Sequence, residues 1–307
     1  MKQKIVLGTR GSALALAQTE IVKAMLLAAH SDLEVTHEVI RTTGDIRLDV
    51  KLNEPGTLDK GLFTKELEEA LIAKRIDAAV HSLKDLPTTL PDGLFLSSVL
   101  PRAETADILI GKSPLGLNGI AQGGIVATSS ERRKRHINWL RPDIEVIAIR
   151  GNVPTRLQKL VDNEAWGGII LAQAGLERLG YDVESGHIEA ECITFFATSI
   201  DEMLAAPGQG AIGLETREDD TQTQAILAAI NHEPTLARVR AERALLKKLG
   251  GGCHMPLGVR TILDGDKLFM EAVLFEGDRR EPHVASASGT TAEPEKLAET
   301  IYAKFRQ

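Results

Sequence analysis

Basic residues recur at one kind of position in this sequence: directly after an expected strand, or at the start of the helix that follows it. The six come from four separate segments and are Arg10, Lys84, Arg132, Arg133, Arg150 and Arg156. Ligands of open α/β sheets sit outside the carboxyl ends of the strands, where helix N-termini add backbone N–H donors. A guanidinium can bind both oxygens of a carboxylate. The placement therefore favours one shared site for an anionic ligand, although an isolated run such as ERRKR is more typical of a solvated helix face.

Asp85 and Cys253 are two further groups that could take part in chemistry. Asp85 stands beside Lys84 in HSLKDLP, residues 81–87. A carboxylate among cations stays ionised and could stabilise a cationic intermediate, whereas an aspartate before proline more commonly bonds to the local backbone. Cys253 follows three glycines, so it is either an exposed nucleophile or a small buried thiol after a helix cap. The residue types alone leave both alternatives open, while Cys192, which precedes an apolar strand, is expected in the core.

Composition limits the classes of protein that fit. The chain has 307 residues, 36 Lys and Arg, 43 Asp and Glu, and a formal charge of −7. This acidic total, with only 4% aromatic residues, argues against a nucleic-acid binder. Two cysteines make neither a disulfide framework nor a metal-ligand set, so we expect no metal and a reducing, cytoplasmic environment. No apolar run approaches about 18 residues and Ile5–Leu7 is too short for a signal peptide, so we expect no membrane segment, with a monomer as the default.

Strands and helices alternate over the first 200 residues. In the first hundred, the expected strands are Lys4–Gly8, Val35–Arg41 and Asp77–His81, and the expected helices run from an N-cap at Ser12 to about Ala29 and over Thr64–Lys74. Gly44–Gly61 is expected as a long loop, of a length that often forms a lid. After Pro101 the expected strands are Ile125–Thr128, Glu145–Ile149, Gly168–Ala172 and Ile193–Ala197, with one helix capped by Ser129 or Ser130 and another ending near Asp162. This pattern predicts two α/β lobes with mostly parallel sheets.

A smaller α+β unit is expected from about Gln222. It begins with two helices, the second over Thr235–Leu249, and one of the glycines after it is expected in a left-handed cap. A hairpin follows, with strands Leu257–Leu263 and Leu268–Phe275 and Asp264-Gly265 at its tip. A third strand near His283–Ala287 and a helix over Glu293–Phe305 complete the unit.

Six segments are specific enough to compare with known families. They are TRGSALALAQ, GLFTKELEEAL, HSLKDLP, RGNVPTRLQKL, PGQGAIG and GGCHMPLG, in this order over nearly the whole chain. Together they resemble the porphobilinogen deaminase (hydroxymethylbilane synthase) family. The resemblance implies two α/β lobes like those of periplasmic binding proteins plus a smaller α+β C-terminal domain. It places these domains at residues 1–100 plus about 201–220, at 101–200 and at 221–307.

The resemblance also implies a transferase of tetrapyrrole (haem) biosynthesis. Such an enzyme condenses four porphobilinogen molecules head to tail, with loss of ammonia, on a dipyrromethane cofactor that a thioether would attach to Cys253. Hydrolysis then releases hydroxymethylbilane. Every pyrrole brings two carboxylates, which would account for the spread of arginines in an acidic protein. Asp85 would be catalytic, bonding pyrrole N–H groups and stabilising the cation left by ammonia.

The other site residues are implied by their matching motif positions. Cofactor contacts are implied for Ser12, Lys84, Asp85, Thr128, Ser129, Ser130, Arg132, Arg133, Arg150 and Gly151. Substrate contacts are implied for Arg10, Gln18, Ser82, Arg150, Arg156 and Arg178, with Arg156 at a later ring of the growing chain. Lys60 would belong to the lid. The sequence departs from the family at Glu131, where leucine is usual, and a helical residue there can point away from the neighbouring arginines.

Two other classes of function compete with this enzyme. A binding protein for a small carboxylate would use the same lobes and arginines, but it leaves the glycine-flanked Cys253 unexplained. A nucleic-acid regulator built on ERRKR is disfavoured by the negative charge and the lack of a second basic face.

Overall fold

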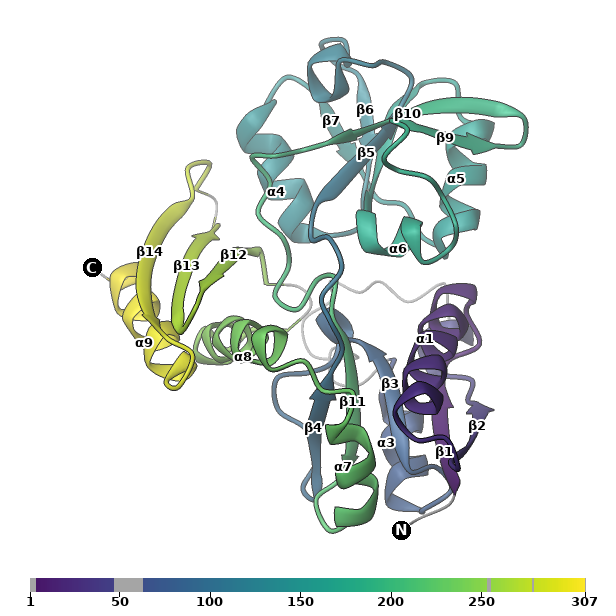
Figure 1. The fold of residues 1–307 in the computed structure, drawn as a ribbon. Helices are drawn as coiled ribbons and strands as arrows, with labels where there is room; N and C mark the ends of the chain where they lie inside the picture. Colours follow the sequence, from purple (N-terminus) through teal and green to yellow (C-terminus); the bar gives the residue numbers. More distant parts are fainter. Residues whose placement is uncertain (1–3, 47–62, 253–254, 278, 307) are drawn as a thin grey trace.

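The computed structural model describes residues 4–46, 63–252, 255–277 and 279–306. In this part of the chain, three sheets each support a separate structural unit (Figure 1). The first lobe lies at the bottom of the view, the second lobe at the top, and the C-terminal domain beside them. The expected class, two α/β lobes and a smaller α+β unit, is confirmed.

The first lobe is built on a five-stranded sheet in the order β2-β1-β3-β11-β4. Its strands are β1 (Lys4–Thr9), β2 (Glu34–Val39), β3 (Ala78–Ser82), β4 (Leu94–Val99) and β11 (Ile212–Arg217). Its helical segments are α1 (Ala13–Ala29), α2 (Thr43–Ile46), α3 (Lys65–Ile72), η1 (Leu83–Asp85) and α7 (Thr221–Ala228). Ser12 caps α1 by accepting a hydrogen bond from the Ala15 N–H at 3.2 Å, as its residue type predicts.

The second lobe has a six-stranded sheet in the order β7-β6-β8-β5-β10-β9. Its strands are β5 (Asp107–Gly111), β6 (Ile125–Ala127), β7 (Glu145–Ile147), β8 (Trp166–Ala172), β9 (His187–Ala190) and β10 (Ile193–Ser199). Its helical segments are η2 (Gly116–Gly119), α4 (Glu131–Leu140), α5 (Val153–Asp162) and α6 (Gln173–Glu177). Separate apolar clusters around Leu157 and Ile137 pack on the sheet, so both of its faces are covered.

Both large sheets are mixed, and the expectation of mostly parallel sheets was wrong. β1 runs parallel to β2 and β3, but β11 is antiparallel to β3 and β4. In the second lobe β6 is parallel to β7 and β8, whereas β5 is antiparallel to β8. The physical reason is the double crossing between lobes. β5 and β11 enter from the other lobe, so they need not follow the direction that a right-handed βαβ crossover imposes.

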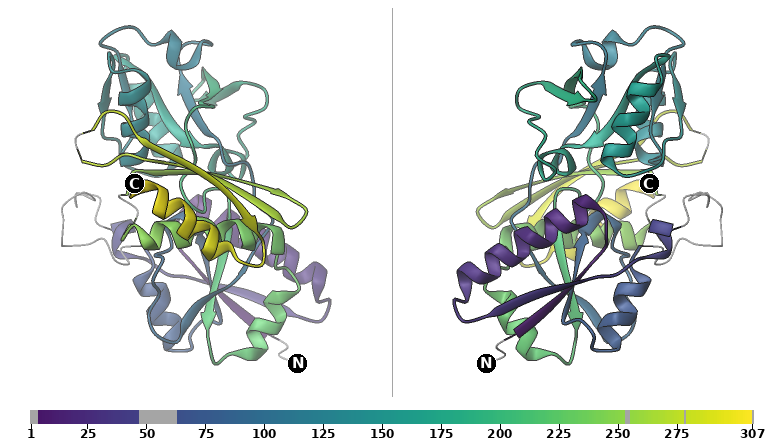
Figure 2. Two further views of the ribbon diagram at one scale, coloured as in Figure 1. Left: turned by 90° about the vertical axis from the view of Figure 1, so that its left-hand side faces the viewer. Right: turned by 90° about the vertical axis from the view of Figure 1, so that its right-hand side faces the viewer.

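The C-terminal domain packs an antiparallel sheet against two helices. Its elements are α8 (Glu233–Lys248), β12 (Leu257–Asp264), β13 (Lys267–Leu274), β14 (His283–Thr290) and α9 (Pro294–Phe305). The strand order is β12-β13-β14, which leaves β12 at an edge. The turned views place this domain beside the junction of the two lobes (Figure 2). Arg102 bonds to Glu242 of α8, and His136 of α4 lies 4.8 Å from the Phe275 ring, so the domain contacts both lobes.

Four further expectations need correction. Thr43–Ile46 is helical, so the long loop does not begin at Gly44. The hairpin tip is Gly265-Asp266, because Asp264 still pairs with Lys267. α7 was assigned to the C-terminal domain, but Leu227 packs in the core of the first lobe, since α7 covers β4 and β11. Cys192 is exposed, because it occupies the tight turn between β9 and β10 with a φ of 63°.

Candidate active site at the junction of the lobes

The segment that presents Asp85 is anchored on both sides by apolar side chains. β3 ends at Ser82 and the chain enters the short helix η1, where Leu83 and Leu86 are buried in a cluster shared with α8. Arg243 of α8 donates hydrogen bonds to the carbonyls of Leu86 and Pro87 at 2.8 and 2.7 Å. Lys84 and Asp85 are half-buried between these anchors. The fixed backbone therefore limits where the Asp85 carboxylate can point.

His81 helps to hold the same strand from inside the lobe. Its Nε2 lies 2.9 Å from Oε2 of Glu215 on β11, and both side chains are buried. This contact joins the neighbouring strands β3 and β11 a few residues before Asp85. His81 is thus a structural, hydrogen-bonded residue, as its position at the end of a strand predicts.

Three polar residues shape the corresponding strand end in the second lobe. Thr128 Oγ1 accepts a hydrogen bond from the Ser130 N–H, and Ser130 caps α4 by accepting from the Arg133 N–H. Ser129 Oγ donates to the carbonyl of Ile149 at 2.5 Å and accepts from its N–H at 3.1 Å. These bonds join the end of β6 to the residues that precede Arg150, so two of the predicted segments are held together.

Arg132 and Arg133 share a buried carboxylate, Asp107 at the start of β5. Arg132 Nη1 lies 2.7 Å from Oδ2, and Nη2 of Arg133 lies 2.7 Å from Oδ1. Burial opposes ionisation of Asp107, but the two guanidinium groups outweigh it and hold the pKa of this carboxyl far below its usual range. Arg132 also donates to the carbonyl of Leu204 and Arg133 to that of Ile170. Both arginines are therefore oriented inward, rather than projecting from a solvated face.

The remainder of ERRKR behaves differently. Glu131 pairs with Arg135 one turn along α4, with 2.9 Å between Oε1 and Nε, while Lys134 is exposed. The unusual glutamate thus points along the helix surface, as expected, and its charge is offset by Arg135.

The turn before α5 presents Arg150 and Arg156. Gly151 has a φ of 114°, and a Cβ there would lie 2.6 Å from Thr155 Cγ2, so the turn favours glycine. Arg156 Nε donates to the Gly151 carbonyl at 2.7 Å, and Lys159 Nζ donates to that of Arg150 at 3.0 Å. The bond through Nε orients the Arg156 guanidinium.

Electrostatic coupling shows that these groups from the two lobes converge. Burial lowers the pKa of Lys84 to about 8; Asp85 opposes that change, and the charges of Arg133 and Arg132 add to it. Burial likewise lowers the pKa of Arg156 to about 10, with Arg133 and Arg150 adding to the decrease and Asp85 opposing it. Five cations thus surround two carboxylates, Asp85 and Asp107. An anionic ligand would relieve the excess positive charge.

The predicted substrate contacts of the first lobe, Arg10, Gln18 and Ser82, have partners within that lobe. Arg10 stacks on Phe63, 4.3 Å from the ring centroid. Gln18 and Ser82 bond to each other, with the Gln18 amide donating at 2.9 Å and the Ser82 hydroxyl donating at 3.1 Å. Arg178, in the second lobe, contacts a different segment. Its Nη2 donates a hydrogen bond to the carbonyl of Gly210, in the crossover between β10 and β11. Burial lowers the pKa of Arg178.

Two predicted residues, Cys253 and Lys60, lie outside the described residues. The structure does describe the end of α8 that leads to Cys253. Gly250 has a φ of 68°, its N–H bonds to the Lys247 carbonyl, and the Gly251 N–H bonds to that of Leu246. This is a Schellman motif, so the predicted left-handed glycine cap is confirmed.

Sequence reasoning missed Asp107 and the pair Arg102–Glu242. Arg102 donates through two nitrogens to Glu242 at 2.6 and 2.9 Å, and Glu242 also accepts from the Gly208 N–H. For Asp107 a signal was present, because an acidic residue at the start of the apolar run DILIG needs a buried cationic partner. Arg102 and Glu242 gave no comparable signal, because each has other charged residues close to it in the sequence and neither interrupts an apolar run.

Comparison with known proteins assigns the family. Residues 5–225 match the family model described as "Porphobilinogen deaminase, dipyromethane cofactor binding domain", and residues 236–307 match "Porphobilinogen deaminase, C-terminal domain". The chain belongs to the porphobilinogen deaminase family. The resemblance seen in the motifs is thereby confirmed over most of the chain.

Individual relatives agree with this assignment. The porphobilinogen deaminase of Desulforudis audaxviator is 42% identical over 301 residues, which cover 98% of this chain and 94% of that protein. The porphobilinogen deaminase of Carboxydothermus hydrogenoformans is 41% identical over 311 residues, covering 100% and 96%. Among solved structures, the methionine-binding protein MetQ aligns with 78% of this chain and 94% of its own, at 12% identity and a TM-score of 0.43. The last likeness adds nothing to the family assignment, which rests on the sequence matches.

The described residues also bear on metal sites and membrane segments. Within the described ranges, no group of three or more His, Cys, Asp or Glu side chains could hold a metal ion. Among the helices of those same ranges, none combines the length and apolar character needed to cross a membrane.

Proposed function

We propose that this protein is a porphobilinogen deaminase that condenses four porphobilinogen molecules head to tail, with loss of ammonia, and releases hydroxymethylbilane by hydrolysis. The observation that carries the proposal is the convergence of Lys84, Arg133 and Arg156 around Asp85, in a chain of this family. Substrate and product are both polycarboxylates, so the excess of positive charge suits them.

The residues at the junction fit the dipyrromethane cofactor that the family implies. When bound, this group supplies the pyrrole carbon to which the first substrate is joined. Arg132, Arg133 and Lys84 would hold its carboxylates, since burial lowers the pKa of both Lys84 and Arg132 and an added anion would oppose that effect. Thr128, Ser129 and Ser130 lie on the same strand end and could add hydroxyl contacts.

Asp85 would act on the positive charge of the incoming substrate. Loss of ammonia from porphobilinogen leaves an azafulvene-type cation whose charge reaches the ring nitrogen. The anchored η1 segment holds the Asp85 carboxylate in place. This carboxylate can accept a hydrogen bond from the pyrrole N–H and stabilise the positive charge without a rearrangement of the site.

The remaining side chains would bind and orient the lengthening product. We assign substrate carboxylates to Arg10, Arg150 and Arg156, with Gln18 and Ser82 as polar contacts from the first lobe and Arg178 near the crossover. Lys60 is assigned to a lid and Cys253 to cofactor attachment on the basis of their motifs. We also expect a cytoplasmic monomer that requires neither nucleic acid nor membrane.

Arg156→Leu is expected to stall elongation at an intermediate chain length. The leucine removes the charge that would hold the carboxylates of one ring, while earlier rings keep Arg132 and Arg133. Intact-mass spectrometry after a limited supply of porphobilinogen should show enzyme–intermediate complexes of one length accumulating. Lys134→Leu, which removes an exposed cation of α4, is the control and should show the normal distribution. Failure before the first addition would contradict the assignment of Arg156 to a later ring.

Intact mass also tests the proposed function as a whole. The purified protein should be heavier than its sequence by two linked pyrroles, and peptide mapping should place the excess on Cys253. Cys253→Ser should lose both the excess mass and the turnover of porphobilinogen, whereas Cys192→Ser, at the exposed turn, should keep both. An unmodified protein that binds porphobilinogen without taking up mass would instead indicate a carboxylate-binding protein.

A further inference from the structure

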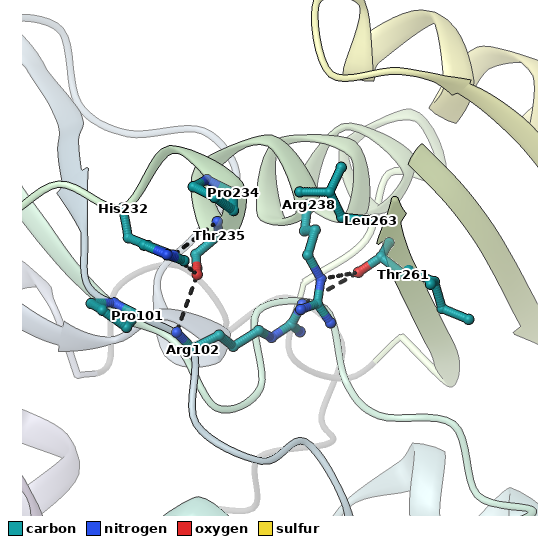
Figure 3. A pocket seen from close by; sticks show the side chains of 9 residues that line it. Pro101, Arg102, His232, Pro234, Thr235, Arg238, Thr261 and Leu263 are labelled. Atoms are coloured by element: carbon teal, nitrogen blue, oxygen red, sulfur yellow. Dashed lines mark hydrogen bonds between the residues drawn. The ribbon is translucent and has the colours of Figure 1, made fainter. Parts of the chain in front are cut away.

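A pocket outside the proposed active site lies where the first crossover, the start of α8 and the edge strand β12 meet (Figure 3). Its volume is about 520 Å³, which lies in the range of small-molecule sites. Arg102 comes from the crossover, Arg238 from α8 and Thr261 from β12. An occupant would therefore touch both the crossover and the C-terminal domain.

Arg238 gives the pocket an oriented cation. Its Nε donates to Thr261 Oγ1 at 3.1 Å, which fixes the plane of the half-buried guanidinium. Within the residues that the structure describes, neither terminal nitrogen of Arg238 has a hydrogen-bond partner. Burial lowers the pKa of Arg238 and the charge of Arg102 lowers it further, while the carboxylates of Glu242 and Glu104 oppose the decrease. This side chain therefore keeps a fork of N–H donors for an anion.

Arg102 shares the pocket but is already neutralised. Both of its terminal nitrogens bond to Glu242, at 2.6 and 2.9 Å, and its Nε donates to the Gln209 carbonyl. Thr261 Oγ1 in turn donates to Glu242 at 2.5 Å. This network holds the pocket wall in place. Among the described residues, Arg238 is thus the pocket cation that has no carboxylate bonded directly to it.

Part of the pocket lining is apolar. Ile262, which is 52% exposed, and Leu263 line it from β12, and Pro101 and Pro234 add further carbon surface. A bare inorganic anion would leave this surface uncovered. A ligand with a small apolar body and one acidic group would cover it while binding Arg238.

We propose that this pocket is a binding site for a small amphipathic acid, with its carboxylate or phosphate on the Arg238 guanidinium and its apolar part on Ile262 and Leu263. The two acidic groups share the chemistry that the guanidinium recognises, and paired probes distinguish them. The site is separate from Asp85, so binding to it does not depend on turnover.

Calorimetric titration of the holoenzyme with 3-phenylpropionate and with phenyl phosphate tests the proposal. At least one probe should bind saturably, and the neutral analogue 3-phenylpropan-1-ol should bind far more weakly. Arg238→Gln should weaken binding of that probe about 10- to 100-fold, the loss expected for a hydrogen bond to a charged group. Arg240→Gln, an exposed arginine on the same helix, should bind like the original protein. The probe with the higher affinity identifies the acidic group.

Ile262→Glu provides a second variant that does not disturb a buried contact. The exposed position tolerates a polar side chain, and its carboxylate would repel the acid, so affinity should fall by a similar factor. Saturable binding that is unchanged by both Arg238→Gln and Ile262→Glu would place the acid elsewhere and overturn the proposal. Absence of saturable binding of either probe at millimolar concentration would overturn it as well.

Discussion

Asp85→Asn is expected to lower kcat about 10²- to 10³-fold while fold and cofactor content stay unchanged. The amide has the shape of the carboxylate, and η1 is held by Leu83, Leu86 and the Arg243 contacts, so the backbone should not move. Only the negative charge that would stabilise the cationic ring is lost, and removal of one preorganised electrostatic group costs this much in other enzymes. The rate of hydroxymethylbilane formation measures the effect.

Asp92→Asn is the matched control for that experiment. Asp92 is exposed and precedes β4, so the same change of charge at that position should leave kcat unaltered. Intact mass would confirm that the Asp85 variant still holds its cofactor. Near-normal turnover in a variant with full cofactor content would remove Asp85 from the mechanism.

Asp107→Asn is expected to destabilise the protein by about 3–5 kcal/mol, the cost of removing one partner from a buried ion pair. The carboxylate is fully buried and bonds to both Arg132 and Arg133, and it also accepts from Gln209 at 3.1 Å. The amide would leave two inward-facing guanidinium groups without a counter-ion. Urea unfolding in the Cys253→Ser background measures this without added stabilisation by the cofactor.

The pH dependence of stability gives the Asp107 prediction a second readout. The folded-state pKa of Asp107 is depressed, so its contribution is fully present above the unfolded value of about 4 and is lost as the pH falls toward the folded value. The difference between Asp107→Asn and the original protein should therefore be constant near neutral pH and shrink in acid. Asp162→Asn, at the exposed end of α5, should change stability by less than about 0.5 kcal/mol. Equal stability of the Asp107 variant would show that the two arginines have other counter-ions.

Helix caps illustrate what can be predicted from short stretches of sequence. Ser12, Ser130 and Gly250 occupy the caps that their residue types favour, because a cap depends on hydrogen bonds between residues at most five positions apart. The expected end of β10 and the expected start of β14 lie within two residues of those in the structure. Position in the sequence also predicted which segments would meet at the strand ends.

The ERRKR helix shows where such prediction ends. From the sequence, an isolated run of this kind is more typical of a solvated face, whereas its position after an expected strand favoured a ligand site. In the structure Arg132 and Arg133 are buried on Asp107, Arg135 pairs with Glu131, and Lys134 is exposed. Which arginine points inward depends on how α4 lies against β5, and the relevant carboxylate is 26 residues away.

The sequence by itself determined the family, the two lobes with a third domain, and the residue types available for binding carboxylates. Tertiary structure alone decided the mixed direction of the sheets, the packing of α7 in the first lobe and the partners of the buried charges. Local propensity and motif spacing involve residues that are close in the sequence, so they can be predicted from the sequence alone. Strand direction and ion pairing arise between segments a hundred residues apart, such as β3 with β11 and Arg102 with Glu242, where only the folded chain brings the partners into contact.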